Sequence, residues 1–269
     1  MKEMKEEQKS QSGTPLIIIG IVLAVVVIGG WYMYSTSKSA PRKPVANATP
    51  GATPKTATIP PNAPPGATPP NMLGSPTAAV TVEEFADFQC PSCGATHPVM
   101  KQIQSMYGSR IKFIYRSFPL PMHDKSYDAA VAAEAAGMQG KFWDMHNQLF
   151  TNQKAWSADP NYREVWAGYA DKIGLDVEKW KNDMAGLPAK SRVDADLQRG
   201  RGLNINTTPT VFVNDKQVPY PEVTVEGLKN IIDAELQNAQ QNQAKPEAPA
   251  ANTATNSTTN AAKAPANSK

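Results

Sequence analysis

The sequence is poor in the residues that build disulfide frameworks, metal clusters and nucleic-acid-binding surfaces. Among 269 residues there are two cysteines and three histidines. Two cysteines exclude a framework of several structural disulfides. The net charge of +3 is small for this length and no long run of Lys or Arg occurs, so no nucleic-acid partner is expected. The two cysteines stand three positions apart, as Cys90 and Cys93, and this pair has to be explained.

Long apolar runs are also scarce, and the clearest one covers residues 16–34, which are 19 residues without a charge. At about 1.5 Å per residue this run approaches the hydrocarbon thickness of a bilayer, about 30 Å. We therefore expect an uncleaved transmembrane anchor, with residues 1–15 on the cytoplasmic side. The alternative is a signal peptide, but cleavage after Ala40 would find Lys38 where a small residue is preferred. Lysines on both sides of the run leave its orientation undecided by charge.

The composition on either side of the central region argues against a packed core there. Residues 35–70 are rich in Pro, Ala and Thr, and the prolines disfavour both helix and central strand, which predicts an extended linker. After Gln237 the sequence has no aromatic residue and no Leu, Ile, Val or Met, so residues 237–269 are predicted to be disordered. Residues 71–236 remain, enough for one folded domain.

Hydrophobic periodicity within this domain predicts an α/β fold, a mixed sheet with a helical insertion at about 124–200. Helix formers dominate the insertion, with breaks at Pro160, Gly174 and Pro188. The other predicted elements are a strand at 80–88, a helix ending near 107, strands at 111–116, 210–213 and 217–219, and a helix at 225–236.

The cysteine pair lies where the predicted strand meets the predicted helix. Cys90 would stand at the helix N-terminus, where unpaired N–H groups and the helix dipole favour a thiolate, so we predict that it is the nucleophile. Cys93 lies one turn further on the same face, close enough to resolve a mixed disulfide. Between them, Pro91 suits a first helical turn, and Ser92 offers the thiolate only a weak hydroxyl hydrogen bond.

The pair has two other possible interpretations. It could be half of a zinc site, completed by His97, His123 or His146, or it could be a structural disulfide. A disulfide that closes a two-residue loop constrains little of the unfolded chain. We therefore favour a redox-active dithiol and expect no metal. His123, His146 and Trp143 are interpreted mainly as packing or surface residues.

Glu84, six residues before Cys90, is a candidate proton carrier. Strict alternation places it on the same face as the apolar residues Val80 and Val82, with Glu83 facing solvent. Burial would raise the pKa of Glu84 and allow it to exchange protons with a nearby thiol. The alternative is a twist or bulge before Phe85 that turns Glu84 to solvent.

A proline stands directly before the strand predicted at 210–213, in the sequence Thr207-Thr208-Pro209. Proline would interrupt a sheet unless it occupies the first position of a strand or a cis turn. The sequence does not distinguish a cis from a trans bond at Pro209.

The order and spacing of these motifs resemble the DsbA-like branch of the thioredoxin superfamily. The resemblance implies a thioredoxin fold with a helical insertion, with Cys90 attacking and Cys93 resolving. It also implies a cis Pro209 that faces the dithiol, backbone hydrogen bonds from Thr208 to an extended substrate, and Glu84 as the buried acid. The oxidising archetype has Pro-His between its cysteines, and the Pro-Ser found here leaves the redox potential open. The segments that carry the resemblance are 73–76, 80–93, 118–120, 141–143 and 208–213.

These observations predict a single-pass membrane protein with an extracytoplasmic thiol–disulfide oxidoreductase domain. The Cys90–Cys93 disulfide would serve as the redox group without another cofactor. It would oxidise unfolded or cysteine-containing exported proteins, and a membrane quinone-linked partner would reoxidise it. Two alternatives stay open: a disulfide reductase or isomerase for specific exported clients, and a non-catalytic tethered module that binds peptides or metal.

Overall fold

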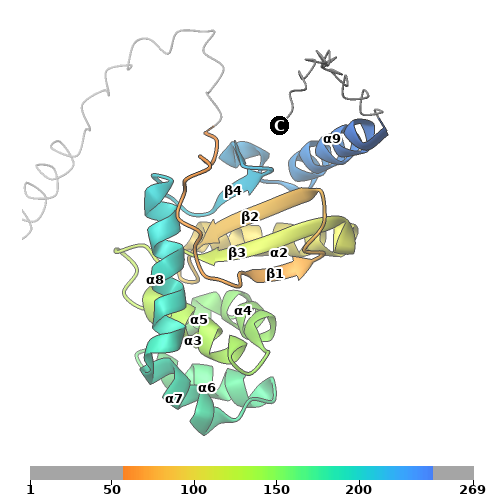
Figure 1. Cartoon of the computed structure of the whole chain (residues 1–269). Coiled ribbons are helices and arrows are strands. Elements are labelled where there is room, and N and C mark those ends of the chain that lie inside the picture. The colour runs from red at the N-terminus through yellow and green to blue at the C-terminus, as the bar shows by residue number, and fades with distance from the viewer. Residues whose placement is uncertain (1–56, 245–269) are drawn as a thin grey trace, which may run out of the picture. The chain divides into compact units, whose positions relative to one another are not determined.

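The computed structural model describes residues 57–244, which form a five-stranded mixed sheet with flanking helices (Figure 1). The strands are Asn71–Gly74 (β1), Val80–Ala86 (β2), Ile111–Ser117 (β3), Thr210–Val213 (β4) and Lys216–Val218 (β5). Their order across the sheet is β1-β3-β2-β4-β5. The two longest strands, β2 and β3, pair in parallel, whereas β1, β4 and β5 join antiparallel to their neighbours.

Two helices follow strands of this sheet, and the others form the insertion between β3 and β4. Helix α2 (Pro91–Tyr107) follows β2, and α9 (Val225–Ala244) contacts both α2 and β2. In Figure 1 the insertion lies below the sheet, and its last helix returns along the sheet and contacts β3. The insertion consists of Ser126–Gly137 (α3), Phe142–Thr151 (α4), Gln153–Ala158 (α5), Tyr162–Lys172 (α6), Val177–Ala185 (α7) and Leu187–Gly202 (α8).

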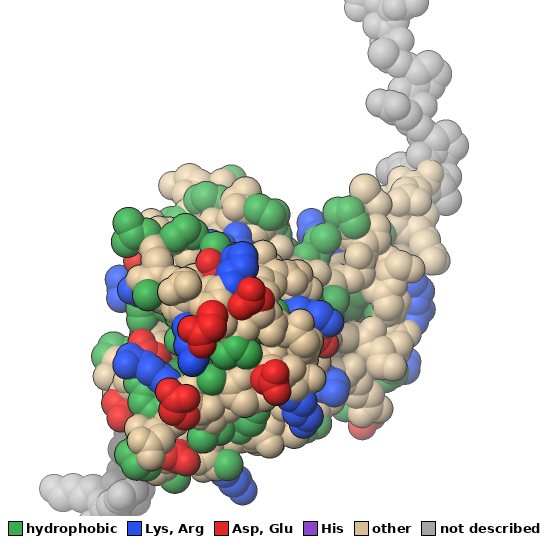
Figure 2. Space-filling view, turned by 90° about the horizontal axis from the view of Figure 1, so that it is seen from below, with side chains coloured by type: hydrophobic (Ala, Val, Ile, Leu, Met, Phe, Trp, Pro, Cys, Tyr) green, Lys and Arg blue, Asp and Glu red, His purple; other side chains and the backbone are tan. Residues whose placement is uncertain are grey.

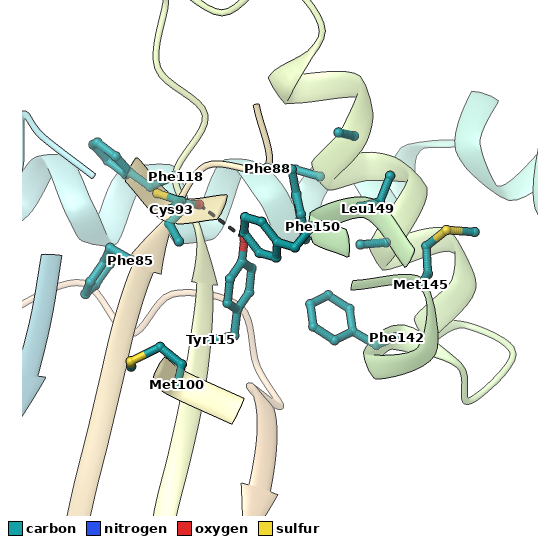
Figure 3. Packing of buried hydrophobic residues seen from close by; sticks show 14 of the residues in the cluster. Phe85, Phe88, Cys93, Met100, Tyr115, Phe118, Phe142, Met145, Leu149 and Phe150 are labelled. Carbon is teal, nitrogen blue, oxygen red and sulfur yellow. Dashed lines mark hydrogen bonds between the residues drawn. The ribbon is translucent and has the colours of Figure 1, made fainter. Parts of the chain in front are cut away.

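The core lies on both faces of β2 and β3, which explains why these strands are buried along almost their whole length. Aromatic rings continue the core from the sheet into the insertion, as Figure 3 shows. The ring of Phe88 lies 5.3 Å from that of Tyr115 on β3 and 4.8 Å from that of Phe150 on α4. The outer surface of the insertion carries charges of both signs side by side (Figure 2), typical of a solvated face.

Most elements agree with the sequence predictions, including the mixed sheet and the helical insertion. The structure corrects the C-terminal boundary, because α9 continues to Ala244 and the first eight residues of the predicted disordered tail are helical. Ala and Gln dominate this extension, and both propagate a helix without needing a buried side chain. The edge strand β1 was not predicted, since its four residues show no alternation.

The predicted linker is also shorter than expected. Residues 57–70 pack against the domain, with an isolated β-bridge between Thr58 and Lys216 and with Ala67 only 2% exposed. Ile59 N donates to Asp215 O at 2.8 Å. Proline has no N–H, but the residues between the prolines supply donors, and the boundary predicted at residue 70 therefore lies too late. The predicted anchor at 16–34 lies outside the described residues. None of the helices between residues 57 and 244 combines the length and the hydrophobicity that a membrane span requires.

A buried ion network holds this N-terminal segment to the sheet. Glu83, 4% exposed, accepts hydrogen bonds from Arg116 on β3 at 2.7 Å and from Arg199 on α8 at 2.7 and 2.8 Å. Arg116 also donates to Ala67 O at 2.9 Å, and Asp196 accepts from Arg116 at 3.0 Å and from Ala67 N at 2.8 Å. The prediction that Glu83 faces solvent is wrong, because α8 covers the second face of the sheet.

The two arginines keep Glu83 ionised. Burial alone would raise its pKa, but the hydrogen bonds and positive charges of Arg199 and Arg116 outweigh burial and lower the pKa. The free energy of the network therefore depends on complete pairing, since a buried charge that loses its partner is strongly unfavourable.

We predict that Glu83→Ala lowers the free energy of unfolding by about 3–5 kcal/mol, because it leaves two guanidinium groups without their shared carboxylate. Urea unfolding at pH 7 measures this loss. The control is Glu178→Ala, which removes an exposed partner of Lys181 and should change stability little. Equal losses in the two variants would contradict the proposed importance of the network.

Candidate active site

The two cysteines lie where β2 passes into α2. Cys90 is the N-cap residue, with φ −70° and ψ 122°, and Pro91 follows in the first turn. The turn is closed by a hydrogen bond from Cys90 N to Asp87 O at 3.1 Å. Both cysteines are free thiols in the structure, with Cys90 7% exposed and Cys93 fully buried. The sequence prediction of a dithiol at a strand-to-helix junction is therefore confirmed.

The surroundings of the two sulfurs separate their pKa values. A hydrogen bond from the Cys93 thiol contributes most to lowering the pKa of Cys90 to about 5. Burial of Cys90 opposes this shift, whereas the Thr208 side chain and the backbone N–H groups of Cys93 and Ser92 assist it. Burial, followed by the proximity of Cys90, raises the pKa of Cys93 well above its ordinary value. In the reduced site at neutral pH, the negative charge therefore resides on Cys90 and the proton on Cys93.

Thr208 and Pro209 face Cys90 from the loop before β4. The Thr208–Pro209 peptide bond is cis, as the family resemblance implied, and both residues are buried. The Cys90 Sγ lies 3.5 Å from Thr208 O. The fold thus brings together two segments that are more than a hundred positions apart in the chain.

Glu84 lies on β2 between Tyr115 of β3 and Val211 of β4. It is 3% exposed, which confirms the predicted burial and rules out the alternative that it faces solvent. Burial raises its pKa to about 8, so it is protonated at neutral pH. In the described part of the chain, no hydrogen bond joins its carboxyl group to Cys90 or Cys93. Proton exchange between Glu84 and a thiol stays a prediction.

Asp87 is a buried acid at the site that the sequence interpretation missed. Its backbone N–H points at the Cys93 sulfur, 3.5 Å away. Its carboxylate accepts from Gln89 N at 2.7 Å and Leu120 N at 2.8 Å, and lies 2.7 Å from His123 Nδ1. Asp87 thus ties the cysteine turn to the loop after β3 and brings His123 beside the site. A signal was present in the sequence, because Asp87 is an acid just after an apolar strand and just before the cysteines.

The other two histidines belong to the aromatic core. The rings of His97 and His146 lie 5.2 Å apart, and His97 stacks on Phe150. Burial, with a smaller effect of Lys101, lowers the pKa of His97 to about 4. Residues 57–244 contain no cluster of three or more His, Cys, Asp or Glu side chains suited to a metal ion, so nothing there favours the zinc interpretation.

Comparison with known proteins identifies relatives of the same architecture. A family described as Thioredoxin matches residues 67–234. Oxidised BdbD from Bacillus subtilis is 28% identical with a TM-score of 0.56, and the match covers 65% of this chain and 98% of BdbD. A thioredoxin-like oxidoreductase from Silicibacter pomeroyi DSS-3 is 26% identical with a TM-score of 0.53, over 64% of this chain and 92% of that protein. Wolbachia pipientis α-DsbA1, 20% identical with a TM-score of 0.55 over 65% and 95% of the two chains, shares the fold.

Curated relatives of a different description also match. The Na(+)/H(+) antiporter NhaA 1 of Mycolicibacterium gilvum (strain PYR-GCK) is 35% identical over 147 residues, 54% of this chain and 23% of the antiporter. The antiporter NhaA 1 of Mycobacterium sp. (strain KMS) is 36% identical over 151 residues, 55% of this chain and 24% of the antiporter. This chain spans about a quarter of the length of these relatives, so the match does not carry their named activity over to it.

Burial of Glu84 predicts a pH-dependent effect of Glu84→Gln on stability. The folded pKa of about 8 lies above the ordinary value of 4.5, so the folded state binds the extra proton and wild-type stability is lost as pH rises from 4.5 to 8. Glutamine has no such titration. Relative to wild type, Glu84→Gln should gain little at pH 4 and about 3 kcal/mol at pH 7. Denaturant unfolding of both reduced proteins at the two pH values tests this, and a difference independent of pH would contradict it.

Proposed function

Because the chain belongs to the thioredoxin family, as a DsbA-like thiol–disulfide oxidoreductase, we propose that its Cys90–Cys93 disulfide oxidises paired thiols in exported proteins. The observation that carries this direction is the low pKa of Cys90, about 5, beside a Cys93 whose pKa is raised. A stabilised thiolate favours the reduced form of the enzyme, and a pair whose reduced form is stabilised is a strong oxidant of other thiols.

The proposed reaction has two exchanges. A client thiolate attacks Cys90 Sγ, the Cys90–Cys93 bond breaks, and the Cys93 sulfur leaves and takes up a proton because its pKa is high. The client is then joined to Cys90 in a mixed disulfide. A second client thiolate attacks the client sulfur of that bond, and Cys90 leaves as a stable thiolate. Two electrons have then passed from the client to the enzyme, and the client holds a new disulfide.

Neighbouring residues have distinct roles in this scheme. Glu84, protonated at neutral pH, supplies the proton that Cys93 takes up when it leaves. An extended client segment lies beside Thr208 and the cis Pro209, whose backbone binds it and holds its cysteine next to Cys90. Pro91 and Ser92 set the geometry of the helix start and present the Ser92 amide to the thiolate.

The cellular context is part of the same proposal. Residues 16–34 anchor the protein in the membrane, the segment after them holds the domain on the extracytoplasmic side, and a membrane quinone-linked partner reoxidises the dithiol. The long uncharged apolar run and the need of an oxidase for an oxidising compartment support this location. The dithiol acts without another cofactor.

Equilibration with glutathione tests the direction of electron flow. We expect a reduction potential between about −120 and −180 mV, the range of the oxidising and isomerising members of the superfamily. The ratio of oxidised to reduced protein in glutathione buffers of known composition measures it. A value near that of thioredoxin, about −270 mV, would contradict the oxidase and favour the reductase.

Two serine variants test the separate roles of Cys90 and Cys93 in thiol oxidation. Cys90→Ser should abolish thiol oxidation, because the attacked sulfur is lost. Cys93→Ser should instead accumulate a mixed disulfide with a client peptide that is supplied as a disulfide: the Cys90 thiolate attacks that bond, the other peptide sulfur leaves as a thiol, and no Cys93 remains to release the product, which mass spectrometry detects. A Cys90→Ser variant that still oxidises the peptide would contradict the assignment of Cys90.

A further inference from the structure

One side chain of the helical insertion reaches the turn that carries the nucleophile. Gln153 is the first residue of α5 and is 9% exposed. Its Nε2 donates to Phe88 O and to Cys90 O, at 2.8 Å each. Both hydrogens of the Gln153 amide therefore bind backbone carbonyl groups, one on each side of Gln89. The second of these carbonyl groups belongs to Cys90.

These two carbonyl groups matter because of where Cys90 stands. As the N-cap residue it has an extended backbone, and its carbonyl group already accepts the first helical bond, from Gly94 N at 3.1 Å. The direction of that carbonyl group fixes the orientation of the peptide units that follow, and hence where the N–H groups of Ser92 and Cys93 point. Gln153 gives Cys90 O a second donor and gives Phe88 O a donor as well, so its amide fixes both carbonyl groups and holds the turn in this orientation.

Gly94 provides an independent sign of the same contact. Glycine is unfavourable in the interior of a helix. Gly94 nevertheless lies within α2, and its φ is not positive, so the backbone conformation does not require a glycine there. A Cβ atom added at this position would lie 2.4 Å from Gln153 Oε1 and 3.1 Å from Gln153 Nε2. The absence of a side chain at position 94 therefore leaves the space that the Gln153 amide occupies.

We propose that Gln153 is a positioning residue for the thiol chemistry and that Gly94 admits it, so that the helical insertion sets the reactivity of Cys90 through this one amide. The role of Gln153 rests on the proposed function, in which Cys90 carries the mixed disulfide and leaves as a stabilised thiolate. Gln153 contacts neither sulfur and acts through the backbone of the cysteine turn.

A second glutamine offers a matched control. The Gln139 side chain also binds backbone at a helix N-cap, donating to Asp176 O and accepting from Asp176 N at 3.1 Å each. It stabilises the start of α7, and its hydrogen bonds go to Asp176 and not to the cysteine turn. Replacement of Gln139 therefore tests the loss of a helix-capping amide without touching the turn.

The experiment measures the Cys90 thiolate by its ultraviolet absorbance against pH, and the equilibrium of the full-length protein with glutathione. Gln153→Ala and Gln153→Met should each raise the midpoint of the thiolate titration by about one pH unit. Up to a tenfold change of the glutathione equilibrium towards the disulfide should accompany the shift, which corresponds to about 30 mV. Gln139→Ala should leave both readings unchanged. Gln153→Met keeps the length of the side chain without its donors or a charge, so it serves if the alanine variant folds poorly.

Gly94→Ala separates positioning from a general loss of stability. In the wild-type background it should displace the Gln153 amide and shift the titration in the same direction as Gln153→Ala. In the Gln153→Ala background it should cause no further shift, because the amide it would displace is gone.

Three results are decisive. Gln153 and Gly94 variants that lower the melting temperature but leave the titration and the glutathione equilibrium at wild-type values would overturn the positioning role. An equal effect of Gly94→Ala in both backgrounds would overturn the link between the two residues. A wild-type Cys90 that titrates at an ordinary thiol pKa would instead refute the proposed function itself.

Discussion

The chemistry of this site depends on the position of one proton between two sulfurs. The Cys93 thiol, buried behind Cys90, donates to the Cys90 sulfur, while the N–H groups at the start of α2 point at the same atom. Each sulfur shifts the pKa of the other in the opposite direction, so the pair holds one negative charge at neutral pH. The remaining structure maintains this geometry: Asp87 fixes the turn from the β3 side, the loop at Thr208 closes over Cys90, and Gln153 reaches the turn from the insertion.

Two adjacent glutamates on β2 are both buried, one on each face of the sheet, and their different surroundings give them opposite ionisation states. Glu83 meets Arg116 and Arg199, and its pKa is lowered in spite of burial. Glu84 points to the opposite face, where no cation among residues 57–244 lowers its pKa, so burial alone raises it. The Glu83 carboxylate therefore serves as a structural anion that, through Arg116, fastens Ala67 to the sheet, and the neighbouring Glu84 keeps its proton at neutral pH. The same strand thus carries an ionised carboxylate on one face and a protonated carboxyl group on the other.

The sequence was sufficient for elements that rest on local signals. The apolar pattern of β2, the Cys-Pro start of α2 and the proline before β4 each identify an element from neighbouring residues. Features that depend on distant partners could not be read in this way. The pairing of Thr58 with Lys216 joins positions 158 residues apart. Glu83 is buried because α8 covers it, and the alternation of side chains along a strand carries no information about a helix that packs against it. Gln153 escaped detection because it binds backbone carbonyl groups, which carry no side-chain signature.

The central claim is that folding stabilises the Cys90 thiolate and thereby favours the reduced enzyme. Its most direct test compares the denaturant unfolding of the reduced and the disulfide forms between pH 4 and pH 8. A lowered pKa contributes stability above the folded value and loses it as pH falls through about 5. The reduced form should therefore be the more stable at pH 7, and its advantage should shrink towards pH 4. A disulfide form that is more stable than the reduced form at pH 7 would contradict the account.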